Sequence, residues 1–134
     1  MKLQTLFTIA SVYMMLVGLG FILFPHAFGK GAVPEDASPA LIAYLRLWGS
    51  PLLGIAVMDW MVRKAGPSST RNAIIVGNTI GFAVIGLLDA WGTFSGGRPV
   101  TKIFVVVHLL LAVVFILVGR KNWSTQKDQQ DLSI

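Results

Sequence analysis

Arginine, aspartate and histidine residues lie inside long apolar stretches of this 134-residue chain, where a charge is costly and therefore informative. Arg46, Asp89 and His108 have the chemistry of a polar pocket. The guanidinium would hold an anionic or polar headgroup, while the carboxyl and the imidazole would exchange hydrogen bonds or protons. Counted from the ends of their stretches, the three residues fall within about one or two helical turns of the same level. They form the centre of a candidate site.

Other residues extend this pocket along the same helices. Asn78 and Asp89 lie about 20° from alignment on a helix of 3.6 residues per turn, and Phe82 falls between them. Because an unpaired charge facing lipid costs several kcal/mol, this polar stripe is expected to face the interior of the protein. The predicted ligand-binding set is Arg46, Trp48, Asn78, Phe82, Asp89 and His108. Asp89 and His108 are the two candidates for a catalytic role, which stays open.

Each charged residue also has a purely structural interpretation. Arg46 would extend its methylene stem so that its charge reaches the headgroups, or it would pair with Asp89 and fix the helix register. His108 would be a hydrogen-bonded histidine on a helix of valine and leucine. Asp59 is expected to form a local salt bridge with Arg63, one helical turn later.

The elements that position these residues are four apolar runs. Of the 134 residues, 54% are hydrophobic and only 13% charged, against roughly a quarter charged in soluble domains. The predicted spans cover about 3–24, 41–62, 72–91 and 103–119. We expect an all-α integral membrane protein, an up-down-up-down bundle whose second helix is kinked at Pro51. The transmembrane domain would occupy residues 1–121, and residues 122–134 would form a polar cytoplasmic tail.

Lysine and arginine set the expected orientation. Seven of the 11 cations fall on one predicted side, three fall on the other, and Arg46 lies within a span. The seven are Lys2, Arg63, Lys64, Arg71, Arg120, Lys121 and Lys127, and the three are Lys30, Arg98 and Lys102. The positive-inside rule therefore places both termini in the cytoplasm of a plasma or bacterial inner membrane. The candidate pocket then lies near the outer surface.

Composition also excludes several classes of function. The chain has no cysteine, hence no disulfide, thiolate metal site or redox pair. Its two histidines lie far apart in the sequence, and it has no phosphate-binding glycine loop. We expect neither a metal nor a cofactor. The net charge of +5 sits at the ends of apolar runs, which favours anionic lipid over nucleic acid as a partner.

One packing motif leaves the assembly state open. Gly77 and Gly81 have the spacing of a small-residue contact between membrane helices. This contact would form within the chain, in a homodimer or with another membrane protein.

The sequence Arg46-Leu-Trp-Gly49, near the outer end of a kinked second helix, is followed by a short basic inner turn. With its four compact spans, the chain resembles small bacterial four-helix (tetraspan) membrane proteins, which include DoxX-like proteins and uncharacterised families. The resemblance covers Leu3 to Gly119 as a pattern. It implies the fold and assigns no functional residue.

Three functions fit these residues. The favoured one is a non-enzymatic protein whose outward-side pocket binds a lipid or other amphipathic small molecule, or supports a membrane complex. The first alternative is a membrane-embedded isomerase or cyclase acting on an isoprenoid or sterol-like substrate by acid–base chemistry. There, Asp89 or His108 would move the proton. The second is a small dimeric transporter in which Asp89 or Asp59 titrates.

Overall fold

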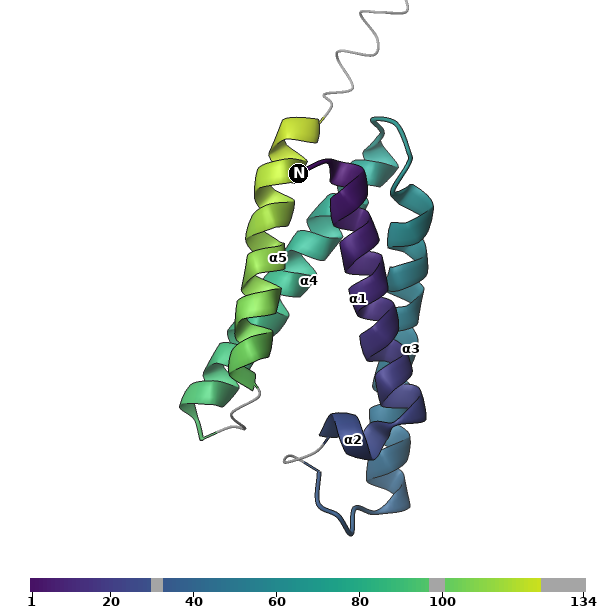
Figure 1. The fold of residues 1–134 in the computed structure, drawn as a ribbon, viewed down its shortest axis with the longest axis vertical. Helices are drawn as coiled ribbons and strands as arrows, with labels where there is room; N and C mark the ends of the chain where they lie inside the picture. The colour runs from purple at the N-terminus through teal and green to yellow at the C-terminus, as the bar shows by residue number, and fades with distance from the viewer. Residues whose placement is uncertain (30–32, 97–100, 124–134) are drawn as a thin grey trace, which may run out of the picture. The chain divides into compact units, whose positions relative to one another are not determined.

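The chain folds into helices, four of which are long. A computed structural model describes residues 1–29, 33–96 and 101–123. Its helices are α1 (Leu3–Leu23), α2 (Pro25–Gly29), α3 (Pro39–Val62), α4 (Ser69–Phe94) and α5 (Thr101–Asn122) (Figure 1). All except α2 are long and apolar enough to cross a membrane. The prediction of an all-helical protein with four candidate membrane spans is confirmed.

Side-chain caps explain where two of the long helices begin. The Ser38 hydroxyl accepts a hydrogen bond from the backbone N–H of Leu41 (3.3 Å), next to the start of α3. Ser68 likewise accepts one from the N–H of Arg71 (3.2 Å) at the start of α4. Each serine satisfies a backbone donor of the first turn. Helix α4 therefore starts three residues before the predicted span of 72–91, and it ends three residues after it.

A short helix interrupts the segment that the sequence predicts to be a polar connector. Helix α2 begins at Pro25, whose fixed φ suits the first position of a helix. Pro25 also explains why α1 ends at Leu23, because the residue before a proline avoids the helical conformation. The ring of Phe28 packs against that of Phe21, with centroids 5.6 Å apart, so α2 folds back onto the end of α1.

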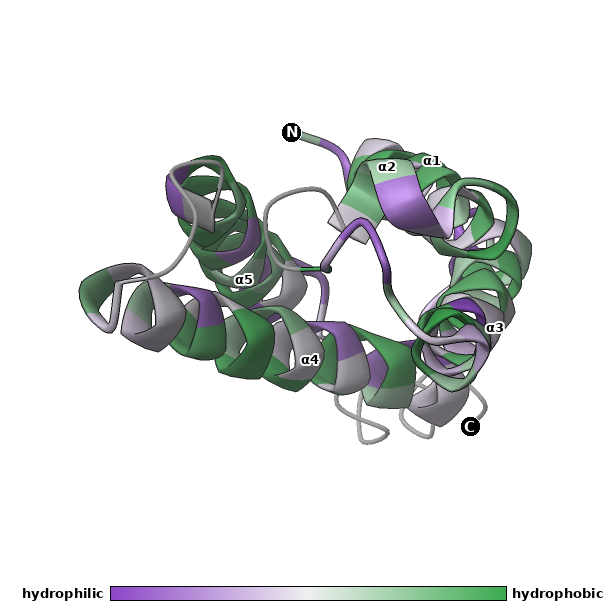
Figure 2. Ribbon diagram, turned by 90° about the horizontal axis from the view of Figure 1, so that it is seen from below, coloured by the Kyte–Doolittle hydropathy of each residue, from purple (hydrophilic) through white to green (hydrophobic). Residues whose placement is uncertain are grey.

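The chain divides into two compact units, which we describe separately. The α1–α3 unit is Phe7–Met61, and the α4–α5 unit combines Met1–Leu6 with Val62–Ile134. Hydrophobic residues, drawn in green, are prominent along the long helices of both units (Figure 2). Many large apolar side chains are exposed, among them Leu16, Leu87 and Trp91. Such exposure suits helices that face lipid rather than water.

In the α1–α3 unit, two long helices run antiparallel and meet through small residues. A Cβ added at Gly49 would lie 2.5 Å from the Gly18 carbonyl oxygen, so only glycine permits this approach. Farther along, the Ser11 hydroxyl donates a hydrogen bond to the Ala56 carbonyl (2.7 Å). In lipid, such a bond satisfies a hydroxyl that has no access to water.

In the α4–α5 unit, the two helices are also antiparallel and pack over most of their length (Figure 1). Gly86 contacts Leu109, and Gly119 contacts Ile75. Their core is apolar and includes Ile75, Phe82, Leu111, Ala112, Phe115 and Val118. Within this unit, a Cβ at Gly77 or Gly81 would meet no atom within 4 Å. The α4–α5 contact therefore uses other glycines than the predicted pair.

Two finer features of the predicted architecture stay predictions. These are the up-down-up-down arrangement of all four long helices and a kink at Pro51, a residue that lies inside the uninterrupted helix α3. The predicted tail lies outside the described residues beyond Trp123, and so do Lys30, Arg98 and Lys127 of the charge count.

Candidate functional site

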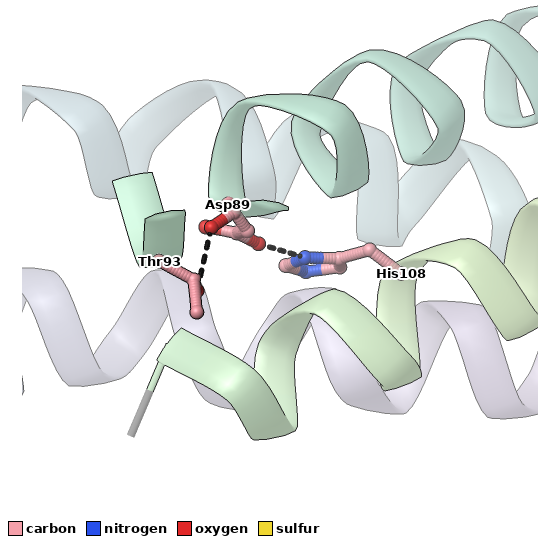
Figure 3. A network of polar contacts seen from close by, with 3 residues as sticks. All are labelled: Asp89, Thr93 and His108. Carbon is pink, nitrogen blue, oxygen red and sulfur yellow. Dashed lines mark hydrogen bonds and ion pairs between the residues drawn. The ribbon is translucent and has the colours of Figure 1, made fainter. Parts of the chain in front are cut away.

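The central polar contact of the α4–α5 unit joins Asp89 to His108. The Oδ2 atom of Asp89 lies 2.6 Å from Nδ1 of His108 (Figure 3). The imidazole side chain is 8% exposed and the carboxyl side chain 21% exposed. A contact this short is typical of a hydrogen bond strengthened by charge. The pair is thus mostly buried, and part of the carboxyl group is still accessible.

The position of the pair follows from the antiparallel packing of the two helices. Asp89 lies near the end of α4 and His108 near the start of α5. Next to them, Leu109 contacts Gly86, one turn before Asp89. Because glycine has no side chain, the two helices approach closely there. This approach brings a short aspartate side chain within reach of the imidazole.

A second hydrogen bond acts on the backbone at Asp89. The Thr93 hydroxyl donates to the Asp89 carbonyl oxygen at 2.8 Å, and Figure 3 shows this bond beside the Asp89–His108 contact. It follows the back-bonding pattern of threonine in helices, in which the hydroxyl bonds the carbonyl four residues earlier. Thr93 therefore supports the last turns of α4 and is no direct partner of the carboxylate.

Aromatic rings enclose the imidazole. His108 stacks on Phe104 (centroids 5.9 Å apart, planes at 20°) and on Phe82 (6.1 Å, 27°). Phe82 then stacks on Phe115 (5.9 Å, 19°), and both of these phenylalanines are fully buried. The four rings form a continuous stack along the α4–α5 interface. We call Asp89, His108 and these three phenylalanines the dyad site. The stack fixes the plane of the imidazole.

The dyad has a defined chemical capacity. A carboxylate facing Nδ1 selects the histidine forms in which Nδ1 carries a proton. In the neutral form, Nε2 is then the acceptor and the potential base. The same arrangement orients the histidine in hydrolytic triads and in many metal sites. A partly accessible carboxylate also accepts hydrogen bonds from a hydroxyl or amine group.

The structure divides the six predicted ligand-binding residues between the two units. Asn78, Phe82, Asp89 and His108 belong to the α4–α5 unit. Asn78 is buried, and its amide donates to the Ile74 carbonyl (3.1 Å) of its own helix. It lies about three turns from Asp89.

Arg46 and Trp48 lie in the α1–α3 unit, on α3. Both are exposed, and the Trp48 ring makes an edge-to-face contact with Tyr44 (centroids 6.0 Å apart). Because the two residues belong to a different unit from Asp89, the predicted Arg46–Asp89 ion pair stays a prediction. The carboxylate has His108 as a partner in any case.

Asp59 is a second acidic residue inside a candidate span. It lies on α3 and is fully buried. Its predicted salt bridge with Arg63 stays a prediction.

One buried arginine was not singled out by the sequence. Arg71, on the first turn of α4, is only 7% exposed. Its guanidinium donates to the Asn122 carbonyl at the end of α5 (2.5 Å) and to the Ala65 carbonyl (3.4 Å). In the sequence it was one of seven topology charges. Ser68, three residues earlier and suited to an N-cap, was the available signal that Arg71 lies in the first turn of a helix.

No group of three or more histidine, cysteine, aspartate or glutamate side chains that could hold a metal ion occurs in the part of the chain that the structure describes. In comparisons with family models, curated proteins and solved structures, the chain matches none. The resemblance to DoxX-like and other tetraspan proteins therefore stays a hypothesis.

Proposed function

We propose that this protein binds a lipid or another amphipathic small molecule at the dyad site, without transforming it. The observation that carries the proposal is the 2.6 Å contact between Asp89 and His108, made by two candidate membrane-spanning helices. A hydroxyl or amine group of the ligand would donate a hydrogen bond to the accessible part of Asp89, beside the imidazole. Its apolar part would lie along the exposed apolar surface of α4 and α5.

The energetics of the membrane favour a functional role for this pair. Taking a carboxylate and an imidazole out of water costs several kcal/mol, which their mutual attraction offsets only in good geometry. Elsewhere the α4–α5 interface is mainly apolar residues and glycine contacts, with the Arg71–Asn122 hydrogen bond at its far end. Such packing holds membrane helices together without ionisable groups. A role in ligand binding would explain why the protein keeps a pair whose burial costs free energy.

We also propose how the four long helices are arranged in the membrane. The four long helices would form an up-down-up-down bundle with α3 kinked at Pro51, and Arg46 would supply a positive charge to the same outward-side pocket. Both termini would lie in the cytoplasm. Epitope tags at the two ends should then resist protease added to intact cells, and cleavage of either tag would overturn this topology.

Photoaffinity labelling tests the binding site. The probe is a phospholipid with a diazirine in its acyl chain, applied to the purified full-length protein with and without excess unmodified phospholipid. The proposal predicts competed labelling on the second half of α4 and the first half of α5. Asp89→Ala should reduce it several-fold. Thr79→Val is the matched control, because the Thr79 hydroxyl donates to the Ile75 carbonyl of its own helix, the same kind of bond that Thr93 makes to Asp89. Labelling spread evenly over all four long helices would overturn the proposal.

A second candidate is acid–base catalysis on a lipophilic substrate, by an isomerase or cyclase. It is favoured by one observation, the orientation of Nδ1 of His108 by a carboxylate. In that case Nε2 would exchange a proton with the substrate, and Asp89 would stabilise the imidazolium. The test is incubation of the protein with a total lipid extract, followed by mass spectrometry. A product formed by the wild-type protein and absent with His108→Phe would favour catalysis over binding alone.

A further inference from the structure

The end of the α4–α5 unit opposite the dyad site collects three separate segments. They are the turn before α4, the first turn of α4 and the last turn of α5. The Arg71 guanidinium joins them through its hydrogen bonds to the carbonyls of Ala65 (3.4 Å) and Asn122 (2.5 Å). Figure 1 shows that α4 begins and α5 ends at the same end of this hairpin. Residues distant in sequence therefore become neighbours there.

These segments carry positive charge. Lys64, Arg120 and Lys121 are exposed, and Arg63 is half-buried. Neither aspartate nor glutamate occurs between residues 62 and 76 or between residues 115 and 123. With Arg71, residues 62–76 and 115–123 thus contribute five cationic side chains and no acidic one to this end of the unit. We call Arg63, Lys64, Arg71, Arg120 and Lys121 the basic end.

The helix termini reinforce this charge. A helix C-terminus normally presents carbonyl oxygens with a partial negative charge. At the end of α5, Arg71 occupies the Asn122 carbonyl, and the Asn122 amide donates to the Val118 carbonyl (2.8 Å). These bonds engage two carbonyls that would otherwise attract cations. The start of α4 lies at the same place and contributes the positive end of its dipole.

From this arrangement we infer that the basic end binds the phosphate headgroups of anionic phospholipids. It lies at the ends of candidate membrane spans, where headgroups are found, and exposed Trp123 follows directly. In this site, Lys64, Arg120 and Lys121 contact the headgroup. Arg71 is a positioning residue, because its guanidinium is engaged with backbone carbonyls. The inference is independent of the dyad site and of what that site binds.

The test is a titration of the purified full-length protein, in a non-ionic detergent, with short-chain phosphatidylglycerol. Each exposed cation near a membrane surface adds about fivefold in affinity. The triple variant Lys64→Gln/Arg120→Gln/Lys121→Gln should therefore bind about a hundredfold more weakly than the wild type. Lys102→Gln is the matched control, because Lys102 is exposed on the same helix at its other end. Circular dichroism establishes that each variant keeps its helices.

Three results would overturn the inference. They are equal binding of short-chain phosphatidylcholine, equal loss in the Lys102→Gln control, and undiminished binding by the triple variant. Inorganic phosphate is the remaining probe. If it binds as tightly as phosphatidylglycerol, the site recognises a free anion and a lipid site is excluded. The inference predicts that phosphate binds far more weakly, and that raising the salt concentration weakens phosphatidylglycerol binding, because screening acts on exposed charges.

Discussion

Nδ1 of His108 lies 2.6 Å from Oδ2 of Asp89, although 19 residues separate them in the sequence. The contact crosses from the end of one candidate membrane span to the start of the next. Stacked phenylalanine rings lie on both sides of the imidazole. Because the pair is held between apolar helices, the contributions of Asp89 and His108 to stability should depend on each other. This coupling is measurable.

Removing both partners of the dyad should destabilise the protein by less than the sum of the two single removals. Asp89→Ala and His108→Phe should each lower the free energy of unfolding by about 1–3 kcal/mol, because each leaves a mostly buried polar group without its partner. The phenylalanine preserves ring stacking on Phe82 and Phe104. The double variant should lose less than the sum of the two, with a coupling of about 0.5–3 kcal/mol. Denaturant unfolding in detergent measures all four proteins, and additive losses would show that the contact contributes no coupling.

The same experiment tests whether Arg46 joins the dyad. If Arg46 pairs with Asp89 as proposed, Asp89→Asn should destabilise the protein, and adding Arg46→Gln should recover part of the loss. The coupling should be smaller than that of the dyad, because Arg46 is exposed on α3. Strictly additive effects in this cycle would separate Arg46 from the site and leave the Asp89–His108 pair intact.

Arg71 should be important for stability because it satisfies carbonyls from two other segments. Arg71→Met keeps an apolar stem but removes both hydrogen bonds, to Ala65 and to Asn122. A hydrogen bond to a charged group is worth about 1.5–3 kcal/mol, so the thermal midpoint should fall clearly. Lys64→Gln is the control, because this cation is exposed on the neighbouring turn. Equal midpoints for the two variants would mean that the Arg71 contacts add nothing to stability.

Two glycines of α3 should respond in opposite ways to alanine. In Gly49→Ala, the new Cβ would lie 2.5 Å from the Gly18 carbonyl oxygen, so α1 and α3 would have to separate. The expected loss is about 1–3 kcal/mol. Gly54 has no atom within 4 Å of an added Cβ, and Gly54→Ala should stabilise the helix or leave it unchanged. Unfolding of both variants in detergent gives the comparison. Equal effects would contradict the close approach at Gly49.

Much of the fold was accessible from the sequence because length and apolar composition determine membrane spans. The four predicted spans agree with α1, α3, α4 and α5 to within three residues at each end. Helix α2 was missed because five residues are too few to give a periodic pattern, although Pro25 marks its start. The earlier start of α4 could have been predicted only by recognising Ser68 as its N-cap.

The site was accessible only in part. Depth along each helix placed Asp89 and His108 at a similar level, and the structure shows them in contact. Depth gives no information on how each helix is rotated about its axis, and α5 is apolar on all sides of His108. Opposite charge alone suggested Arg46 as a partner of Asp89, beside the interpretation in which Arg46 extends to the headgroups. It also could not indicate that Arg71 is buried, because that depends on where α5 ends.

The most direct test of the proposed function is native mass spectrometry of the protein purified in mild detergent, with extraction and identification of the bound small molecules. We predict that the wild-type protein and Thr79→Val carry one specific lipid or amphipathic molecule in stoichiometric amount, and that Asp89→Ala and His108→Phe lose it. A wild-type protein that carries no such molecule, or only bulk phospholipid retained equally by all four proteins, would contradict binding at the dyad site.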